Sequence, residues 1–310
     1  MITRWTGQFE RRPLARPNLP YVLWRFVANA NRTSQALLTT KRFHDTRTIA
    51  RELTANGIVA RPSDAFLSDA GRHALTEAAS DIITSSQRAD VQAIVAGTAS
   101  PKGVKNFRID LIPRGISSAH PVLKVALDVR LLEIVAAYLG MWPALHSVGA
   151  WLNYPTSTPA ASSQLWHHDP EDLKIIKAFI YLEPVTEENG PFTYIPGTHP
   201  FGRHVAAGAK YKKSGVGDEQ LRADFPSSTW QVCTGPANAM ILADTVGYHR
   251  GGKPSRGTRL LVTFTYTSGT PLVQPSIWLK GAPDWITFPI QRVAVQRLGN
   301  TPPVKASANK

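Results

Sequence analysis

The chain has 310 residues, of which 43% are hydrophobic and 18% charged, so it can bury a full core and lacks the composition of a disordered protein. Its single cysteine, Cys233, excludes an internal disulfide and a cysteine-rich zinc site, and fits a reducing compartment. The net charge of +13 is compatible with an anionic partner. Because the sequence has no long basic helix, zinc finger or RNA-binding signature, we do not expect that partner to be nucleic acid.

Near the N-terminus, the segment LPYVLWRFVANA (19–30) follows several basic residues, as a targeting segment would. Arg25 interrupts its apolar run, which argues against a signal peptide, and the run is too short to span a bilayer. Tyr21, Trp24 and Phe26 leave open a peripheral contact with an anionic membrane surface, at the inner face of a membrane. Packing on the protein's own domain is the commoner role of such a segment, so we expect a cytoplasmic protein.

Residues 1–145 have the pattern of helices and loops. Apolar residues recur at helical spacing in 68–86, after a serine or aspartate that can cap the helix. The segment 120–140 predicts one or two helices that end at Gly140. Between them, 106–113 alternates like a short strand. We expect this half to be a helical region that supports the rest of the fold.

Residues 146–300 change to short strands separated by turns. Five segments are rich in β-branched and aromatic residues: SVGAWLNY, IIKAFIYL, PFTYIPG, ANAMILAD and TRLLVTFTY. The turn signal EENGP (187–191) predicts a hairpin between two of them. Several short strands without intervening helices indicate a sandwich or barrel, and a jelly roll is the natural candidate. The fold class is thus mainly β with α, with both halves forming one integrated domain.

The motif QLWHHDPED (164–172) holds two adjacent histidines and an aspartate. On an extended segment, side chains at i and i+2 share a face, so His167 and Asp169 point together and His168 points away. A neutral imidazole and a carboxylate on one face suit a divalent metal. Because HxD occurs often by chance, a metal site here needs a third ligand.

The downstream candidates for that ligand are His199, His204 and His249. His249 follows an apolar strand, and Arg259 comes ten residues after it, at the start of the next strand. Two histidines and one carboxylate form the facial arrangement of non-haem Fe(II) sites used for oxygen chemistry. A nearby arginine can bind a carboxylate with a bidentate fork. Arg256 competes for this role, but its neighbours Pro254 and Gly257 place it in a turn.

The stretch from HPVLKVALD (120–128) to TRLLVTFTY (258–266) resembles the phytanoyl-CoA dioxygenase family of Fe(II)/2-oxoglutarate-dependent oxygenases. The matching pieces are QLWHHDPED, FIYLEPVTEENGPFTYIPGTH, and DTVGYHRGG with its trailing arginine. The resemblance implies a double-stranded β-helix, a distorted jelly roll, which agrees with the strand pattern.

The resemblance also implies the site residues and cofactors. Fe(II) would be bound by His167, Asp169 and His249, and the cosubstrate 2-oxoglutarate would be held by Arg259, with O2 as co-reactant. Asn153 stands near the position where relatives place an asparagine that contacts the cosubstrate. Some relatives have a serine or threonine two residues after the distal histidine. This chain has Gly251 there, so one contact of those relatives is missing.

We therefore expect a dioxygenase that hydroxylates an unactivated C–H bond of a small-molecule or lipid-linked substrate, with an anionic one favoured by the basic surface. Halogenase relatives lack the carboxylate ligand, so Asp169 favours hydroxylation. Two alternatives stay open. One is a cupin-like metal-binding jelly roll without 2-oxoglutarate chemistry, which would not need Arg259. The other is a basic protein that binds a polyanion or a membrane surface and whose histidines are incidental. The sequence does not indicate an oligomeric state.

Overall fold

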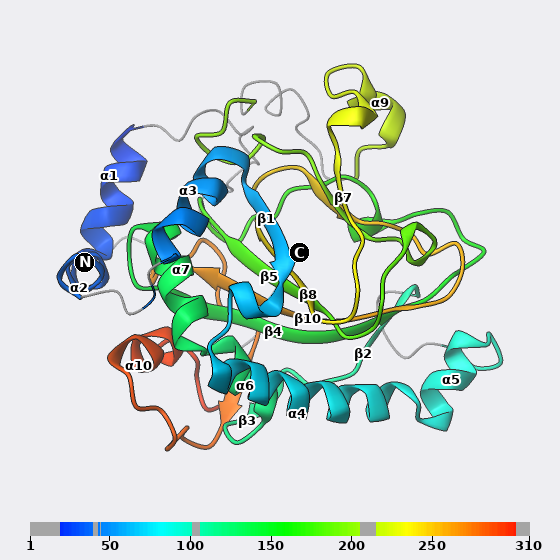
Figure 1. The fold of residues 1–310 in the computed structure, drawn as a ribbon, viewed down its shortest axis with the longest axis horizontal. Helices are drawn as coiled ribbons and strands as arrows, with labels where there is room; N and C mark the ends of the chain where they lie inside the picture. Colours follow the sequence, from blue (N-terminus) through cyan, green and yellow to red (C-terminus); the bar gives the residue numbers. More distant parts are fainter. Residues whose placement is uncertain (1–18, 40–42, 44, 101–105, 205–214, 302–310) are drawn as a thin grey trace, which may run out of the picture.

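The computed structural model describes residues 19–39, 43, 45–100, 106–204 and 215–301. Its centre is a six-stranded sheet that faces a three-stranded sheet, with helices covering the outside (Figure 1). The larger sheet has the order β1 (Ile58–Pro62), β8 (Ala239–Asp244), β5 (Ile176–Tyr181), β10 (Arg259–Thr267), β4 (Ala144–Asn153) and β2 (Arg108–Asp110). The smaller sheet has the order β7 (Gln231–Cys233), β6 (Phe192–Tyr194) and β9 (His249–Gly251). The mainly β class with a jelly-roll core is confirmed.

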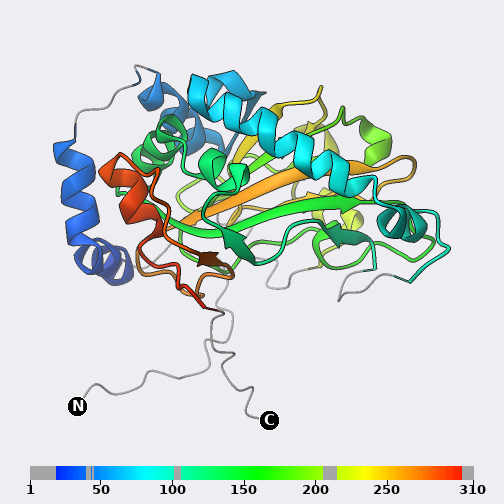
Figure 2. The same cartoon turned by 90° about the horizontal axis from the view of Figure 1, so that it is seen from below.

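Helices pack on the outer face of the larger sheet, and α4 lies across the strands (Figure 2). The described helices are α1 (Leu19–Ala28), α2 (Ala30–Leu38), α3 (Thr46–Asn56), α4 (Asp69–Ser86), α5 (Ala89–Val95), α6 (Pro121–Ala126), α7 (Val129–Leu139), α9 (Asp218–Arg222) and α10 (Pro289–Val295). A parallel pair, β3 (Gly115–Ser117) with β11 (Trp278–Lys280), completes the fold. None of the described helices is long and apolar enough to cross a membrane.

The central strand β10 shows why the molecule has two cores. Successive side chains of a strand point to opposite faces. Leu260, Val262 and Phe264 point outward into the core shared with α4, α6 and α7. Leu261 points inward, where it packs with Phe192 of the smaller sheet. The inner face is the one on which polar residues of the larger sheet, such as Arg259 and Thr263, are also buried.

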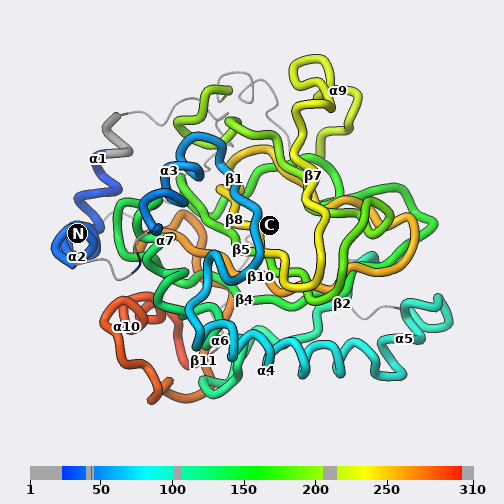
Figure 3. Tube along the Cα trace, in the orientation of Figure 1, coloured from blue at the N-terminus to red at the C-terminus, as the bar shows by residue number. Residues whose placement is uncertain are grey.

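The N-terminal half contributes more than helices. Strand β1 pairs with β8, and β2 pairs with β4, so segments from this half form both edges of the larger sheet. Figure 3 shows β1 running beside β8, which lies far from it in the sequence. The strand expected in 106–113 is present as the shorter β2. The sequence analysis missed β1, because its sequence IVARP is short and ends in proline.

Both helical predictions in this half are confirmed. Helix α4 begins after Ser68, whose Oγ accepts a hydrogen bond from the Gly71 amide at 3.2 Å. Residues 120–140 form α6 and α7, and α7 ends at Gly140 with φ of 75°. These caps fix the ends of the helices that pack on the outer face of the sheet.

The hairpin expected around 187–191 is wrong. The turn is there, as a 3-10 segment Glu187–Asn189 followed by Gly190 with φ of 65°. However, β5 before it pairs with β8 and β10, whereas β6 after it pairs with β7 and β9. The turn therefore carries the chain from one sheet to the other, which is how a jelly roll differs from a meander.

Candidate metal centre

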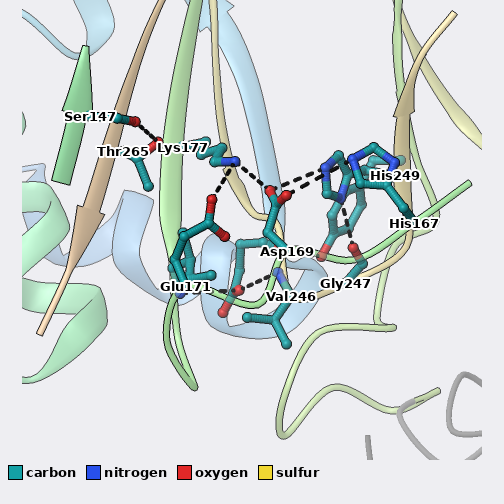
Figure 4. A network of polar contacts seen from close by, with 12 residues as sticks. Ser147, His167, Asp169, Glu171, Lys177, Val246, Gly247, His249 and Thr265 are labelled. Atoms are coloured by element: carbon teal, nitrogen blue, oxygen red, sulfur yellow. Dashed lines mark hydrogen bonds and ion pairs between the residues drawn. The ribbon is translucent and has the colours of Figure 1, made fainter. Parts of the chain in front are cut away.

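Three side chains converge at one end of the smaller sheet (Figure 4). Ligand atoms of His167, Asp169 and His249 all lie within 4.8 Å of one another. The Nε2 atom of His249 is 3.4 Å from Oδ2 of Asp169, and Nε2 of His167 is 3.9 Å from Oδ1. The two imidazole centroids are 4.2 Å apart. The HxD pair and the distal histidine thus meet as the sequence predicted.

Backbone pairing sets this arrangement. His167 and His249 form an antiparallel bridge in which each amide donates to the other's carbonyl at 3.0 Å. The amide of Asp169 donates to the Thr245 carbonyl at 2.8 Å. Because the segment is extended, Asp169 lies on the same face as His167. Main-chain hydrogen bonds therefore hold all three side chains in register.

Both imidazoles present the same nitrogen to the centre. Nδ1 of His167 lies 2.8 Å from the Leu165 carbonyl, and Nδ1 of His249 lies 3.0 Å from the Gly247 carbonyl. A carbonyl only accepts, so each Nδ1 carries the proton and each Nε2 keeps its lone pair. Burial, with a contribution from His249, lowers the pKa of His167 to about 3. Two inward Nε2 atoms and one carboxylate form the donor set that suits non-haem Fe(II), so the residues fit that ion.

The carboxylate of Asp169 also has a cationic partner. Nζ of Lys177, on β5, lies 2.6 Å from Oδ2 of Asp169 and 3.3 Å from Oε1 of Glu171 (Figure 4). Burial alone would raise the pKa of Asp169, but Lys177 and then His249 outweigh it, so the pKa falls well below its usual range. Asp169 is therefore ionised at neutral pH and held on one oxygen by an ammonium group.

Arg259, at the start of β10, is a second buried charge, and its surroundings differ. It is 4% exposed, and its Nη1 donates to the Gly252 carbonyl at 3.2 Å. Among the residues that the structure describes, none offers it a carboxylate, and its Nε has no hydrogen-bond partner. Burial lowers its pKa to about 10, so the guanidinium stays charged at neutral pH. A buried cation without an anion is costly, which points to an anionic ligand at this position.

Asn153 neighbours the Arg259 backbone, and Gly251 lies next to the guanidinium. Asn153 faces Arg259 across the β4–β10 ladder, and its Nδ2 donates to the Arg259 carbonyl at 3.4 Å. A Cβ added to Gly251 would lie 2.9 Å from Nη2 of Arg259. The glycine thus leaves room for the arginine where some relatives have a larger residue. Arg256, the competing candidate, is exposed on the turn that precedes the strand.

Comparison with known protein families identifies the family of this chain. Residues 53–235 match the family described as phytanoyl-CoA dioxygenase (PhyH). The chain belongs to this family. The match includes His167, Asp169 and Lys177 but ends before His249 and Arg259, so it does not bear on the last two residues; the structure brings His249 to the cluster and buries Arg259 at the start of β10. Membership in PhyH supports a dioxygenase-type activity.

Two solved structures similar to this PhyH protein are distant in sequence. One is the non-heme alpha ketoglutarate dependent epimerase SnoN from nogalamycin biosynthesis, at 16% identity, covering 74% of this chain and 83% of SnoN, with a TM-score of 0.49. Another is EctD from S. alaskensis with 2-oxoglutarate and 5-hydroxyectoine, at 23% identity, covering 75% and 80%, with a TM-score of 0.47. Comparison with curated proteins gave no match.

The other predicted candidates lie elsewhere. His168 stacks on Tyr248, with ring centroids 5.8 Å apart, and is not part of the ligand cluster. Nε2 of His199 lies 3.0 Å from the Thr54 carbonyl, and His204 is exposed. These contacts account for each side chain without a metal.

Lys177 is the residue at this PhyH site that the sequence analysis did not single out. It lies in the strand IIKAFIYL, in phase with Phe179 and Tyr181, which pack between the sheets. A lysine in phase with inward residues of a strand signals a buried charge, since lysine is almost never buried without a partner. The sequence offered that signal, but only the fold shows that the partners are Asp169 and Glu171.

Proposed function

We propose that this protein is an Fe(II)/2-oxoglutarate-dependent dioxygenase that hydroxylates an unactivated C–H bond. Membership in PhyH supports the class, and the His–Asp–His cluster supports the metal. The observation that carries the proposal is Arg259, a buried guanidinium without an acidic partner among the described residues. A generic metal site would not need this charge, whereas a dicarboxylate cosubstrate would bind it.

The ligands would be His167, Asp169 and His249. Iron bound there would supply the redox chemistry that lets O2 oxidise 2-oxoglutarate to succinate and CO2, with the second oxygen atom entering the substrate as a hydroxyl group. The presence of Asp169 favours hydroxylation, because the carboxylate occupies the position that halogenases leave to a halide.

Residues of the chain would orient the metal ligands and the cosubstrate. The carbonyls of Leu165 and Gly247 fix the two imidazole rings, so their Nε2 lone pairs stay aimed at one point. Lys177 holds one oxygen of Asp169 and leaves the other for the ion. Because Arg259 is buried, its fork would bind the distal carboxylate of 2-oxoglutarate in a partly desolvated place, where a charge-assisted contact is strongest.

Asn153 would support the cosubstrate from the neighbouring strand. Its Nδ2 already donates to the Arg259 main-chain carbonyl, which leaves the amide oxygen as an acceptor on the strand next to Arg259. Its role would be to keep the arginine in place, with its own amide within reach of the same ligand. The substrate itself would be a small molecule or a lipid-linked one, with an anionic group favoured by the net charge of +13.

The test is a titration of 2-oxoglutarate into the Fe(II)-loaded protein without oxygen, followed by the weak visible absorption band of the chelate. We expect the wild-type protein to develop the band and Arg259→Ala to need much more cosubstrate. In the presence of O2, succinate release screened over phosphorylated, acyl-thioester and glycolipid substrates would then identify the substrate class. Iron binding without the chelate band at any concentration would favour the cupin-like alternative.

A further inference from the structure

The helices α1 and α2 at one edge of the molecule have the reverse of the usual polarity (Figures 1 and 2). Each carries one charged residue, and both charges point inward. Arg25 is buried, and its Nη1 donates to the Leu139 carbonyl at 3.4 Å. Arg32 is buried too, and it donates to the carbonyls of Pro143 and Val293, each at 2.9 Å. The arginines thus attach the helices to the body of the protein.

The exposed side chains that the structure describes in α1 are apolar, and α2 exposes two leucines at its C-terminal end beside Asn31 and Ser34. The exposed large hydrophobic side chains there are Leu23, Trp24, Phe26, Val27, Leu37 and Leu38, which together we call the α1–α2 patch. Trp24 is 62% exposed, and Leu38 is 85% exposed. A surface helix of a soluble domain normally buries its apolar side and exposes its charges. Clustered exposed apolar side chains of this kind mark a surface that another phase or molecule covers.

The charge of the surrounding sequence indicates what covers the patch. The first 44 residues contain eight lysines and arginines, two of which are the buried Arg25 and Arg32, and one acidic residue, Glu10, so they carry +7 of the chain's +13. Basic residues that flank exposed tryptophan, phenylalanine and leucine in the sequence are the combination that holds interfacial helices on anionic lipid. A second copy of the chain would bring two segments of +7 together, which like-charge repulsion opposes.

We propose that the α1–α2 patch is a docking surface for an anionic lipid membrane. The apolar side chains enter the boundary between headgroups and acyl chains, and the basic residues of the N-terminal segment attract acidic headgroups. The two buried arginines keep both helices on the protein, so the catalytic roll stays at the membrane surface. This proposal does not depend on the catalytic one, because vesicle binding requires neither iron nor 2-oxoglutarate.

The experiment is co-sedimentation of the full-length protein with vesicles of pure phosphatidylcholine or of equimolar phosphatidylcholine and phosphatidylglycerol. We expect binding to the anionic vesicles, weak binding to the neutral ones, and a decrease with added salt. The variant Trp24→Ser/Leu37→Ser/Leu38→Ser changes no charge and replaces exposed side chains only. It should lower the partition coefficient at least about tenfold. The free energy of burying one large apolar side chain already exceeds the free energy that corresponds to a tenfold change.

The matched control is Val232→Ser, which replaces an exposed hydrophobic residue of β7, far from α1 and α2 in Figure 1, and should bind vesicles as the wild type does. The proposal is overturned if the wild type binds neither vesicle, or if the triple variant binds the anionic vesicles as well as the wild type. It is also overturned if analytical ultracentrifugation shows a wild-type dimer that the triple variant converts to monomer, since the patch would then be a self-interface.

Discussion

Asp169 at the metal centre and Arg259 at the start of β10 are two charged side chains with little exposure, and only Asp169 has a partner of opposite charge among the described residues. Asp169 has Lys177 at 2.6 Å and two imidazoles around it. Arg259 has a backbone carbonyl and no carboxylate among the described residues. The first charge is compensated within the protein, and the second is not.

This difference indicates what kind of ligand each of the two side chains, Asp169 and Arg259, is suited to bind. The Asp169 carboxylate is held by the Lys177 ammonium, and the main chain sets the orientation of the two imidazole rings. These contacts within the protein fix the positions of the three candidate ligands. At Arg259, no described residue supplies a compensating anion, so we expect a bound anionic ligand to recover the cost of burying the guanidinium. Variants at the two ends should consequently have different effects on stability and on binding.

The largest effect is expected at the metal ligands. His167→Ala removes one of the three protein ligands. Loss of a residue that only supports a ligand can lower metal affinity by roughly 100-fold, so loss of a ligand itself should lower iron affinity by more than this. His168→Ala is the matched control, because His168 stacks on Tyr248 and should leave binding nearly unchanged. Anaerobic Fe(II) titration measures both. Equal loss in the two variants would contradict the assignment of faces along this segment.

Lys177→Met tests the compensated end. Methionine has a similar length but no charge, so Asp169 and Glu171 would be left without their shared ammonium. Removing one partner of a buried ion pair costs about 3–5 kcal/mol, so the metal-free variant should lose about this much unfolding free energy. Iron should restore part of it, because the ion then compensates Asp169. Chemical denaturation with and without Fe(II) measures both quantities.

Arg259→Met, measured in the same way, sharpens the comparison. It removes a buried cation that has no acidic partner among the described residues, so the ligand-free protein should lose far less stability than Lys177→Met does. Equal losses in the two variants would mean that Arg259 is compensated after all.

Arg259→Ala tests the uncompensated end by ligand affinity. Leaving the distal carboxylate of 2-oxoglutarate unpaired should cost about 2–5 kcal/mol, by analogy with truncation of one partner of a buried charge pair. This corresponds to an increase of roughly 30-fold to several-thousand-fold in the dissociation constant. Arg259→Lys keeps the charge without the planar fork, so its dissociation constant for 2-oxoglutarate should lie between those of the wild type and Arg259→Ala. Arg256→Ala is the control, since Arg256 is exposed. If Arg256 proves the sensitive position instead, the cosubstrate does not bind at the start of β10.

The strands β4, β5, β8 and β10 could be predicted because their sequences are rich in β-branched and aromatic residues and are separated by turn residues. The face shared by His167 and Asp169 follows from the period of two along an extended segment. The pairing of strands could not be predicted, because a turn such as 187–191 fixes a change of direction but not the partner strand. Likewise, a buried lysine in a strand indicates that a partner exists, whereas its identity as Asp169 depends on contacts distant in the sequence.

The smallest effect concerns His199, a buried side chain that belongs neither to the metal centre nor to the surroundings of Arg259. Nε2 of His199 donates to the Thr54 carbonyl and fixes the loop after β6 against the end of α3. Burial lowers the pKa of His199 below its ordinary value, so the unfolded chain takes up the proton first as the pH falls below about 6.5. This group's contribution to stability is present above the unfolded pKa and is lost as the pH falls from 7 toward 5.

His199→Gln keeps a donor for the Thr54 carbonyl but cannot titrate in this range. The unfolding free energy of this variant should therefore fall less steeply with pH than that of the wild type, by at most about 1.4 kcal/mol per pH unit. His204→Gln is the control, because His204 is exposed, and its slope should match the wild type. Urea denaturation of the metal-free proteins at pH 7, 6 and 5 measures the slopes. Parallel slopes for wild type and His199→Gln would show that His199 takes up its proton equally well in the folded protein.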